Sequence, residues 1–288
     1  MSQGRVVFIG AGPGAADLIT VRGARLLAQA DVVLFDALTD PALRDLAPGA
    51  QWIDVGKRGF SSVPGPNGHP GRASTGQATI DALLVRYARS YATVVRLKGG
   101  DPSIFGRLEE ELQALAQAGI DCEVVPGVTA AIAAAAHTQR PLTRRSTGRS
   151  VSLTTAMTQH GALQAGRHAD TEVFYMAGRQ LGALGRGLRQ AGWADNTPVC
   201  VVSRAGWPDA LASSHALADL GSAAVLHASR PTVVMVGAGA AEVPRTLRPG
   251  GPLLAHASAY AIAPATMQAT SQASHPVGTP ASSSALAP

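Results

Sequence analysis

Short runs of β-branched residues alternate with longer Ala-, Leu- and Arg-rich segments along most of this chain of 288 residues. The expected strands are 5–10 (RVVFIG), 31–36 (DVVLFD), 51–56, 93–99, 122–127, 150–156, 171–176, 198–206 and 231–237. Helical patterns lie between most of them, at 21–30, 79–89, 108–118 and 181–191. Parallel strands need a long crossover between them, usually a helix. The alternation therefore predicts an α/β protein with mainly parallel sheets covered by helices.

Two changes in composition divide the chain. Residues 141–150 (PLTRRSTGRS) are polar and basic and lack a helix or strand pattern, which is typical of a linker. We expect an N-terminal α/β domain at 1–142, a linker at 143–150 and a C-terminal α/β domain at 151–245. After Arg248 the sequence has no Asp, Glu, Lys or Arg. Such a segment cannot bury a core, so 246–288 is predicted to be a disordered tail.

The charge pattern bounds the expected partners. The formal net charge of +5 is not gathered in a dense basic run, so nucleic acid is not an expected partner. The basic residues are mostly arginine, which suits a ligand with carboxylate or phosphate groups. No run of about 18 apolar residues occurs, so we expect no membrane partner and a cytoplasmic protein. The histidines lack ligand spacing, so no metal site is expected.

The first glycine-rich turn, GAGPG, has two interpretations. Gly10, Gly12 and Ala15 fit the dinucleotide fingerprint, which favours an oxidoreductase with a nicotinamide or flavin cofactor. That fingerprint places a helix N-terminus directly after the glycines. Here Thr20 is the best N-cap, so the helix is expected to start only at Val21. The late start favours a different ligand at this turn.

Two further strands end in glycine turns, at 97–102 (LKGGDP) and 124–130 (VVPGVTA). Each turn alone has a structural explanation, since Gly-Gly-Asp-Pro makes a turn and Thr129 is placed to cap the next helix. The carboxyl ends of parallel strands, however, meet at one crevice where ligands bind. Glycine lets the backbone approach a ligand without an intervening Cβ. We therefore predict that GAGPG, GGDPSIF and GVTA surround one ligand.

Several motifs, in their order and spacing, resemble those of the tetrapyrrole methylases. They are GAGPG, ADVVLFD, VGKR, VVRLKGGDPSIFGR, VVPGVTA, RPLT and VFYM, and the resemblance covers about residues 5–240. It implies that S-adenosyl-L-methionine is bound in a cleft between two α/β domains of a homodimer and leaves as S-adenosyl-L-homocysteine. It also implies C-methylation of uroporphyrinogen III at carbons 2 and 7 to give precorrin-2, for sirohaem or cobalamin synthesis.

The resemblance also implies roles for individual residues. Asp36 and Lys57 match the proton acceptor and the proton donor. The residues that match the cofactor-binding motifs are Pro13, Gly99, Gly100, Asp101, Ile104, Thr129, Ala130, Met176 and Ala205. The substrate is rich in carboxylates, and arginine binds carboxylates in a bidentate way. The candidate substrate-binding residues are therefore Arg58, Arg144 and Arg145.

The chain departs from the family's pattern mainly on the substrate side. Ala37 stands where arginine is common after the acid, Leu108 and Glu109 replace glycines, and Ser146 replaces an acid. Four alternatives to uroporphyrinogen III methylation stay open. They are methylation of another corrin precursor, methylation of a non-tetrapyrrole substrate, a dinucleotide-dependent oxidoreductase, and tetrapyrrole binding without catalysis.

Overall fold

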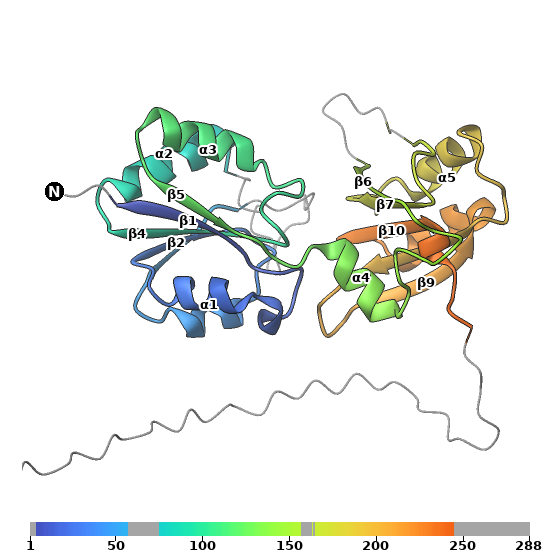
Figure 1. Ribbon diagram of the computed structural model, residues 1–288, viewed down its shortest axis with the longest axis horizontal. Helices are drawn as coiled ribbons and strands as arrows, with labels where there is room; N and C mark the ends of the chain where they lie inside the picture. The colour runs from blue at the N-terminus through green and yellow to red at the C-terminus, as the bar shows by residue number, and fades with distance from the viewer. Residues whose placement is uncertain (1–3, 57–74, 157–162, 164, 245–288) are drawn as a thin grey trace, which may run out of the picture. The chain divides into compact units, whose positions relative to one another are not determined.

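The structure is a computed structural model that describes residues 4–56, 75–156, 163 and 165–244. All of these residues belong to one compact unit, Met1–Gly251. Two five-stranded sheets organise this unit (Figure 1). The expected tail at 246–288 lies outside the described residues.

The first sheet contains β1 (Arg5–Gly10), β2 (Val32–Phe35), β3 (Gln51–Asp54), β4 (Thr93–Lys98) and β5 (Cys122–Val125). Its order is β3-β2-β4-β1-β5, and these pairings are all parallel. Its connections include α1 (Val21–Leu27), α2 (Gln77–Ala88), α3 (Leu108–Gln117) and the 3-10 helices η1 (Ala16–Leu18) and η2 (Pro41–Leu46). Because the strands are parallel, their carboxyl ends lie at one edge of the sheet.

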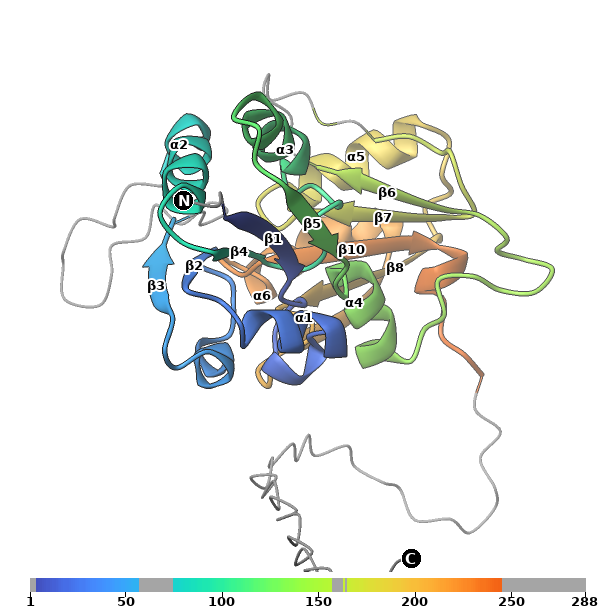
Figure 2. The same ribbon diagram turned by 60° about the vertical axis from the view of Figure 1, so that its left-hand side comes forward.

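Side chains of the first sheet alternate between two covered faces, as the period of two along a strand requires. Phe8 and Leu34 belong to a core cluster with Leu84 of α2. Ile9 belongs to a second cluster, with Leu27 of α1. Figures 1 and 2 show α2 and α3 together on one side of the sheet and α1 on the other. Burial on both faces explains why these strands read as nearly continuous apolar runs.

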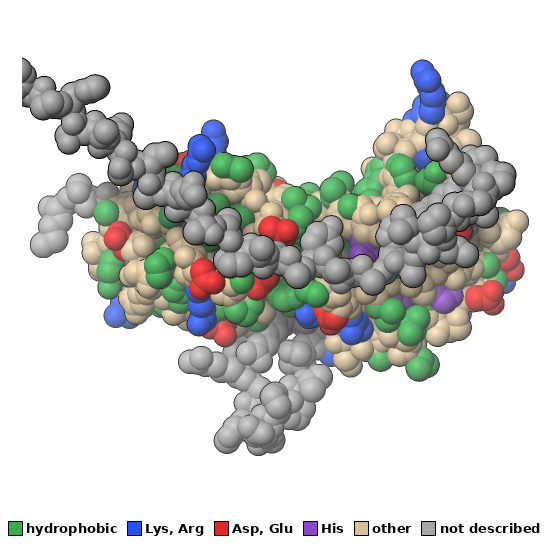
Figure 3. All heavy atoms as spheres, turned by 90° about the horizontal axis from the view of Figure 1, so that it is seen from below, with side chains coloured by type: hydrophobic (Ala, Val, Ile, Leu, Met, Phe, Trp, Pro, Cys, Tyr) green, Lys and Arg blue, Asp and Glu red, His purple; other side chains and the backbone are tan. Residues whose placement is uncertain are grey.

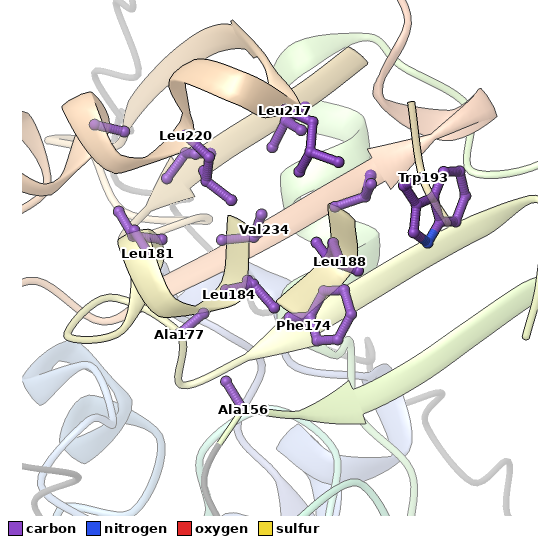
Figure 4. Close-up of a cluster of buried hydrophobic side chains, with 14 residues drawn as sticks. Ala156, Phe174, Ala177, Leu181, Leu184, Leu188, Trp193, Leu217, Leu220 and Val234 are labelled. Carbon is purple, nitrogen blue, oxygen red and sulfur yellow. The ribbon is translucent and has the colours of Figure 1, made fainter. Parts of the chain in front are cut away.

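The second sheet contains β6 (Val151–Thr155), β7 (Thr171–Tyr175), β8 (Pro198–Ser203), β9 (Leu211–Ala216) and β10 (Thr232–Gly237), in the order β6-β7-β10-β8-β9. With it come α4 (Ala130–Thr138), α5 (Leu181–Gln190), α6 (Ala223–Leu226) and the 3-10 helices η3 (Leu217–Ser222) and η4 (Ala238–Ala240). Leu184 and Leu188 of α5 pack on Phe174 and Val234 of the strands (Figure 4). Alanines of α4 pack on side chains of the same strands in a separate cluster.

The second sheet differs from the first in strand direction. β6 and β7 pair in parallel, but β10 runs antiparallel to β7 and β8, and β9 runs antiparallel to β8. Residues 204–210 join β8 to β9, and so short a connection cannot make a parallel crossover. Sequence reasoning missed β9 because LASSHA has no β-branched residues. The α/β class itself is confirmed, with parallel pairing in the first sheet and at one edge of the second.

Two predicted helix starts have different outcomes. Thr20 caps α1, since its Oγ1 accepts a hydrogen bond from Gly23 N at 3.1 Å. The late start of this helix is therefore confirmed. Thr129 occupies the N-cap position of α4, but its side chain makes no capping hydrogen bond. Its hydroxyl instead contacts Tyr175 Oη at 2.8 Å, so the capping prediction for Thr129 was wrong.

The segment expected to be a linker, 143–150, has neither a helix nor a named strand. Within it Arg144 and Gly148 form an isolated antiparallel bridge. The division of the chain into two domains at this segment stays a prediction. In the part of the chain that the structure describes, no helix has the length and apolar character needed to cross a membrane.

Candidate active site

A cavity of about 490 Å³ lies at the carboxyl edge of the first sheet. From this half of the chain, the loops after β1, β2 and β4 and the start of α4 line it. From the second sheet, the loops after β7 and β8 and the residues around the start of β10 line it. The position at the ends of parallel strands is the one that the glycine turns predicted.

The glycines of the three predicted turns pack the turns against one another. A Cβ on Gly127 would lie 2.3 Å from Gly100 O and 2.7 Å from Gly10 Cα, which no side chain tolerates. Gly100 N donates to Gly12 O at 2.7 Å, and Gly12 N donates to Gly100 O at 3.3 Å. Close backbone approach between turns, and not only approach to a ligand, therefore requires glycine at Gly10 and Gly127.

The central turn, GGDPSIF, is also open to the cavity. A Cβ on Gly99 would meet Leu38 Cβ at 3.7 Å, an ordinary contact, and both residues line the cavity. Asp101 fixes the turn: its Oδ1 accepts from Ser103 N, and its Oδ2 accepts from Gly127 N, each at 2.8 Å. One carboxylate thus holds the second turn and ties it to the third.

Backbone strain gathers around the cavity. Most of the described non-glycine residues with positive φ line it, namely Phe105 (51°), Arg107 (55°), Met176 (56°), Arg204 (51°) and Ser229 (58°). The left-handed conformation costs such residues about 1–2 kcal/mol each. Strain of this kind persists where the surrounding structure enforces it, and it clusters at ligand-binding sites. Its distribution supports the cavity as the functional site.

Asp36 follows β2 and lines the cavity, as predicted for a carboxylate at the end of that strand. Its Oδ1 accepts from Arg96 Nη2 at 2.6 Å, and its side chain is 14% exposed. Arg96 is fully buried, and its Nη1 donates to the carbonyl oxygens of Leu34 at 3.3 Å and Leu97 at 3.1 Å. A fixed cation therefore holds one oxygen of Asp36. Among the described residues, no donor is hydrogen-bonded to the other oxygen.

A second buried acid extends this chain of ion pairs. Glu111 of α3 is fully buried and accepts from Arg96 Nε at 3.1 Å and from Lys98 Nζ at 2.5 Å. Lys98 also lines the cavity. Burial, followed by the charge of Arg96, lowers the pKa of Lys98 to about 8, although Glu111 acts to raise it. The acids and bases alternate in the order Asp36, Arg96, Glu111, Lys98.

Tyr175 of β7 connects the two halves of the cavity lining. Its Oη contacts Thr129 Oγ1 at 2.8 Å, and its ring meets the Phe105 ring edge-on with centroids 5.0 Å apart. Burial raises the pKa of Tyr175, so its hydroxyl keeps its proton at neutral pH. A second connection joins the loop after β1 to the loop after β8, where Ala15 N donates to Gly206 O at 2.7 Å.

A chain of buried polar groups supports the wall at β10. Thr232, which lines the cavity, donates from Oγ1 to the Arg230 carbonyl at 2.8 Å, so it accepts from Ser203 Oγ at 3.0 Å. The Ser203 proton is thereby used, and its 2.5 Å contact with His227 must be a donation from Nδ1–H. Burial lowers the pKa of fully buried His227 and favours the neutral ring, whose Nε2 accepts from Ser213 Oγ at 2.8 Å.

Arginines that the sequence reasoning did not select also line the cavity: Arg107, Arg179, Arg204 and Arg230. Arg204 Nε lies 2.8 Å from Asp209 Oδ1, and Arg230 Nη2 lies 3.2 Å from Asp209 Oδ2. The Arg204 guanidinium also lies over the Trp207 ring, 4.4 Å from its centroid. Two cations share one carboxylate here, so this part of the wall keeps a net positive charge.

The structure brings together most of the predicted site residues. Lining the cavity are Asp36 and the cofactor-binding candidates Pro13, Gly99, Gly100, Asp101, Ile104, Thr129, Ala130, Met176 and Ala205. Lys57 and Arg58 lie outside the described residues. Arg144 and Arg145 are described but are not part of the lining: Arg144 Nη2 donates to Ala241 O, and Arg145 is exposed. Their assignment to substrate binding stays a prediction.

Sequence reasoning missed Arg96, Lys98 and Glu111, although a signal was present. Arg96 and Lys98 alternate with apolar residues in a strand whose two faces are both buried, and buried charges require partners. Glu111 lies four residues before the buried Leu115 and so shares its face of α3. Nothing local pairs these residues with Asp36, however, because 60 positions separate Asp36 from Arg96.

The structure also describes charged side chains outside the cavity. On the face shown in Figure 3, basic and acidic side chains are interspersed and form no continuous basic stripe. Among the described residues, no group of three or more His, Cys, Asp or Glu side chains is placed to hold a metal ion. The cavity is therefore the candidate active site.

Comparison with known proteins gives the same family at the levels of sequence and structure. Residues 5–221 match the family described as tetrapyrrole (corrin/porphyrin) methylases. Uroporphyrinogen-III C-methyltransferase of Pseudomonas aeruginosa is 42% identical over 207 residues, which cover 70% of this chain and 80% of that protein. Siroheme synthase of Psychrobacter sp. is 39% identical over 225 residues, and the match spans only 44% of its length.

Solved structures agree with this assignment. The uroporphyrin-III C-methyl transferase of Thermus thermophilus, complexed with S-adenyl homocysteine, is 32% identical with a TM-score of 0.68 and covers 81% of this chain and 97% of that chain. A cobalt precorrin-4 methyltransferase is 29% identical with a TM-score of 0.70 and covers 83% of this chain and 96% of that chain. The motifs, the two-sheet fold and these matches show that the chain belongs to the tetrapyrrole (corrin/porphyrin) methylases.

Proposed function

We propose that this chain transfers methyl groups from S-adenosylmethionine to carbons 2 and 7 of uroporphyrinogen III and so forms precorrin-2. One observation carries the proposal: residues chosen from separate sequence motifs line a single cavity, with Asp36 on its wall. The relative from Thermus thermophilus was crystallised with S-adenyl homocysteine, which supports the cofactor. The activity in the name of the Pseudomonas aeruginosa relative supports the substrate.

The lining of the cavity fits the methyl donor. Gly99 and Gly100 would present backbone groups to its polar parts, and Ile104, Met176 and Ala205 would supply apolar contacts. When bound, S-adenosylmethionine supplies an electrophilic sulfonium methyl group. The contribution of the protein is to hold the reacting partners in line, and orientation of this kind supplies about 7–11 kcal/mol of barrier reduction.

We assign the proton-accepting role to Asp36. When a substituted ring carbon gains a methyl group, the ring must lose a proton from another position to balance its charge, and a carboxylate at the cavity wall can accept that proton. Arg96 holds Oδ1 of Asp36, which leaves Oδ2 as the oxygen available to the cavity. Lys57 is retained as the candidate proton donor on the basis of the family resemblance.

The carboxylates of the substrate need cationic partners. The arginines that line the cavity, Arg107, Arg179, Arg204 and Arg230, extend the candidates beyond Arg58, Arg144 and Arg145. Arginine binds carboxylates through paired N–H donors, so a basic wall favours an acidic tetrapyrrole over a neutral ligand. The resemblance to the tetrapyrrole methylases also supports a cytoplasmic homodimer whose chains each have one α/β domain on either side of the cleft. Light scattering would test the homodimer, and limited proteolysis would test the two domains.

A methyl-transfer assay tests the proposal. The protein is incubated with radiolabelled S-adenosylmethionine and a panel of reduced tetrapyrroles, and the products are analysed by mass. We expect two methyl groups on uroporphyrinogen III; transfer to another corrin precursor alone would favour that substrate instead. Calorimetry supplies the cofactor arm, because binding of NAD or FAD without binding of S-adenosylhomocysteine would contradict a methyltransferase.

A further inference from the structure

The ion-pair chain behind Asp36 has a role of its own. We infer that Glu111 is a positioning residue: it neutralises the two buried cations Arg96 and Lys98 and thereby keeps the Asp36 carboxylate at the cavity wall. This inference rests on the proposed role of Asp36 as proton acceptor. Glu111 itself is fully buried and is absent from the cavity lining, so it acts through other residues.

Each carboxylate oxygen of Glu111 contacts one of the two cations. Its Oε1 accepts from Arg96 Nε at 3.1 Å, and its Oε2 accepts from Lys98 Nζ at 2.5 Å. Both of its oxygens are therefore used below the cavity. Arg96 is left to give Nη2 to a single oxygen of Asp36, at 2.6 Å. Two carboxylates thus balance two cations: Glu111 contacts both Arg96 and Lys98, and Asp36 contacts Arg96.

The residues packed on the other side of Glu111 cannot replace its charge. Gln77 of α2 donates from Nε2 to Glu111 Oε1 at 3.4 Å and to Asp81 Oδ1 at 2.7 Å. Gln77 is neutral, and Asp81 is already hydrogen-bonded to it. Glu111 is thus the carboxylate that contacts both Arg96 and Lys98.

Removal of the Glu111 charge leaves Asp36 as the remaining carboxylate for two buried cations. Asp36 and Lys98 both line the cavity, and Arg96 lies between them in the chain of ion pairs. Without Glu111, Arg96 and Lys98 would both attract Asp36, and its carboxylate would turn inward, away from the cavity. The position of the proposed proton acceptor therefore depends on a residue that touches neither substrate nor cofactor.

Two substitutions separate charge from packing. Glu111→Gln keeps the size of the side chain and removes its charge, whereas Glu111→Asp keeps the charge and loses a methylene group. We expect Glu111→Gln to lower kcat by about 10–100-fold, part of the ~10²–10⁴-fold typical of a positioned acid–base group. Affinity for S-adenosylhomocysteine and the KM for the methyl donor should stay within about threefold. Glu111→Asp should retain more activity than Glu111→Gln, whereas a purely packing role predicts the reverse order.

Two further variants control the experiment. Asp121→Asn changes an exposed acid between α3 and β5, outside the cavity lining, and should leave kcat unchanged. Lys98→Met combined with Glu111→Gln removes one cation with one anion, so Arg96 and Asp36 remain a balanced pair. This double variant should be more active than Glu111→Gln, and a double variant as inactive as Glu111→Gln would overturn the inference. If Glu111→Gln does not fold, the double variant is compared with Glu111→Asp instead. A double variant less active than Glu111→Asp would then overturn the inference.

A structural measurement makes the result independent of the substrate. In crystals of Glu111→Gln, or of Glu111→Asp if the Gln variant fails to fold, the Asp36 carboxylate should turn inward so that its second oxygen also contacts Arg96 or Lys98, more so for Gln. An Asp36 carboxylate in its wild-type position would overturn the positioning role. If the wild-type protein methylates no tetrapyrrole, the proposed function fails, and the crystal structures still decide whether Glu111 positions Asp36.

Discussion

Gly99 offers the sharpest test of whether the central glycine turn serves a ligand or merely turns the chain. Gly99 and Gly100 both line the cavity, but they differ in backbone conformation. Gly100 has φ +73°, where any L side chain is strained, whereas Gly99 is not among the glycines with positive φ. A Cβ on Gly99 would make an ordinary contact with Leu38 Cβ at 3.7 Å. Gly99→Val therefore adds a side chain to the cavity without forcing the backbone.

The expected magnitudes follow from that geometry. For Gly99→Val we expect a change in the free energy of unfolding of less than about 1 kcal/mol, because the added Cβ makes only an ordinary contact and the backbone is not left-handed. Gly100→Val should cost about 1–2 kcal/mol through its left-handed backbone alone. A side chain that overpacks a binding site costs about 1–3 kcal/mol. Gly99→Val should therefore weaken binding of S-adenosylhomocysteine by about 100-fold, which corresponds to about 2.8 kcal/mol.

Calorimetric titration with S-adenosylhomocysteine and thermal unfolding together check this prediction. Gly49→Val is the matched control, because a Cβ there meets nothing within 4 Å and Gly49 lies outside the cavity lining. Gly119, with φ +69° and equally open surroundings, serves as the control for backbone strain at Gly100. If Gly99→Val folds normally and binds the ligand as tightly as the wild type, the turn is only a corner and the reasoning is refuted.

Three further predictions concern single residues. Asp36→Asn should lower turnover by about 10²–10⁴-fold with S-adenosylhomocysteine affinity retained; unchanged turnover at saturating methyl donor would remove Asp36 from the mechanism. Burial lowers the pKa of His227, so the unfolded chain, with its pKa near 6.5, binds a proton that the folded chain does not. Stability should therefore be full above about pH 6.5 and fall as the pH drops below it, by at most about 1.4 kcal/mol per pH unit from this residue. In His227→Gln, the free energy of unfolding measured with urea should depend less on pH between pH 7 and 5 than in the wild type. A pH dependence as steep as that of the wild type would count against this role of His227. Thr20→Ala should cost about 1 kcal/mol through the lost cap on Gly23 N, and unfolding at the wild-type denaturant midpoint would show that the cap is unimportant.

Much of the fold and most of the candidate site were readable from the sequence, because their signals are local. Apolar runs marked the strands, and the spacing of apolar residues marked the helices. Thr20 marked the start of α1, three positions before the amide it caps. The family resemblance identified residues as far apart as Pro13 and Ala205, and the structure places both on one cavity. Resemblance to a family supplied that assignment, and strand-end geometry explains why it works.

Tertiary structure decided the features that depend on partners distant in sequence. β9 became a strand because β8 lies beside it, and not because LASSHA favours one. The hydroxyl of Thr129 bonds to Tyr175 of the second sheet instead of capping its own helix. Arg204 and Arg230 on the cavity wall both contact Asp209, a pairing that no periodic pattern in the sequence predicts.

The ion-pair chain behind Asp36 shows the physical reason for this division. The sequence shows that Arg96, Lys98 and Glu111 are charged and lie in elements with apolar faces, so each needs a partner. Which partner each finds is set by the order of strands β2 and β4 and by the packing of α3 on the sheet. Hydrophobic periodicity is a property of neighbouring residues, whereas the pairing of buried charges is a property of the packed molecule.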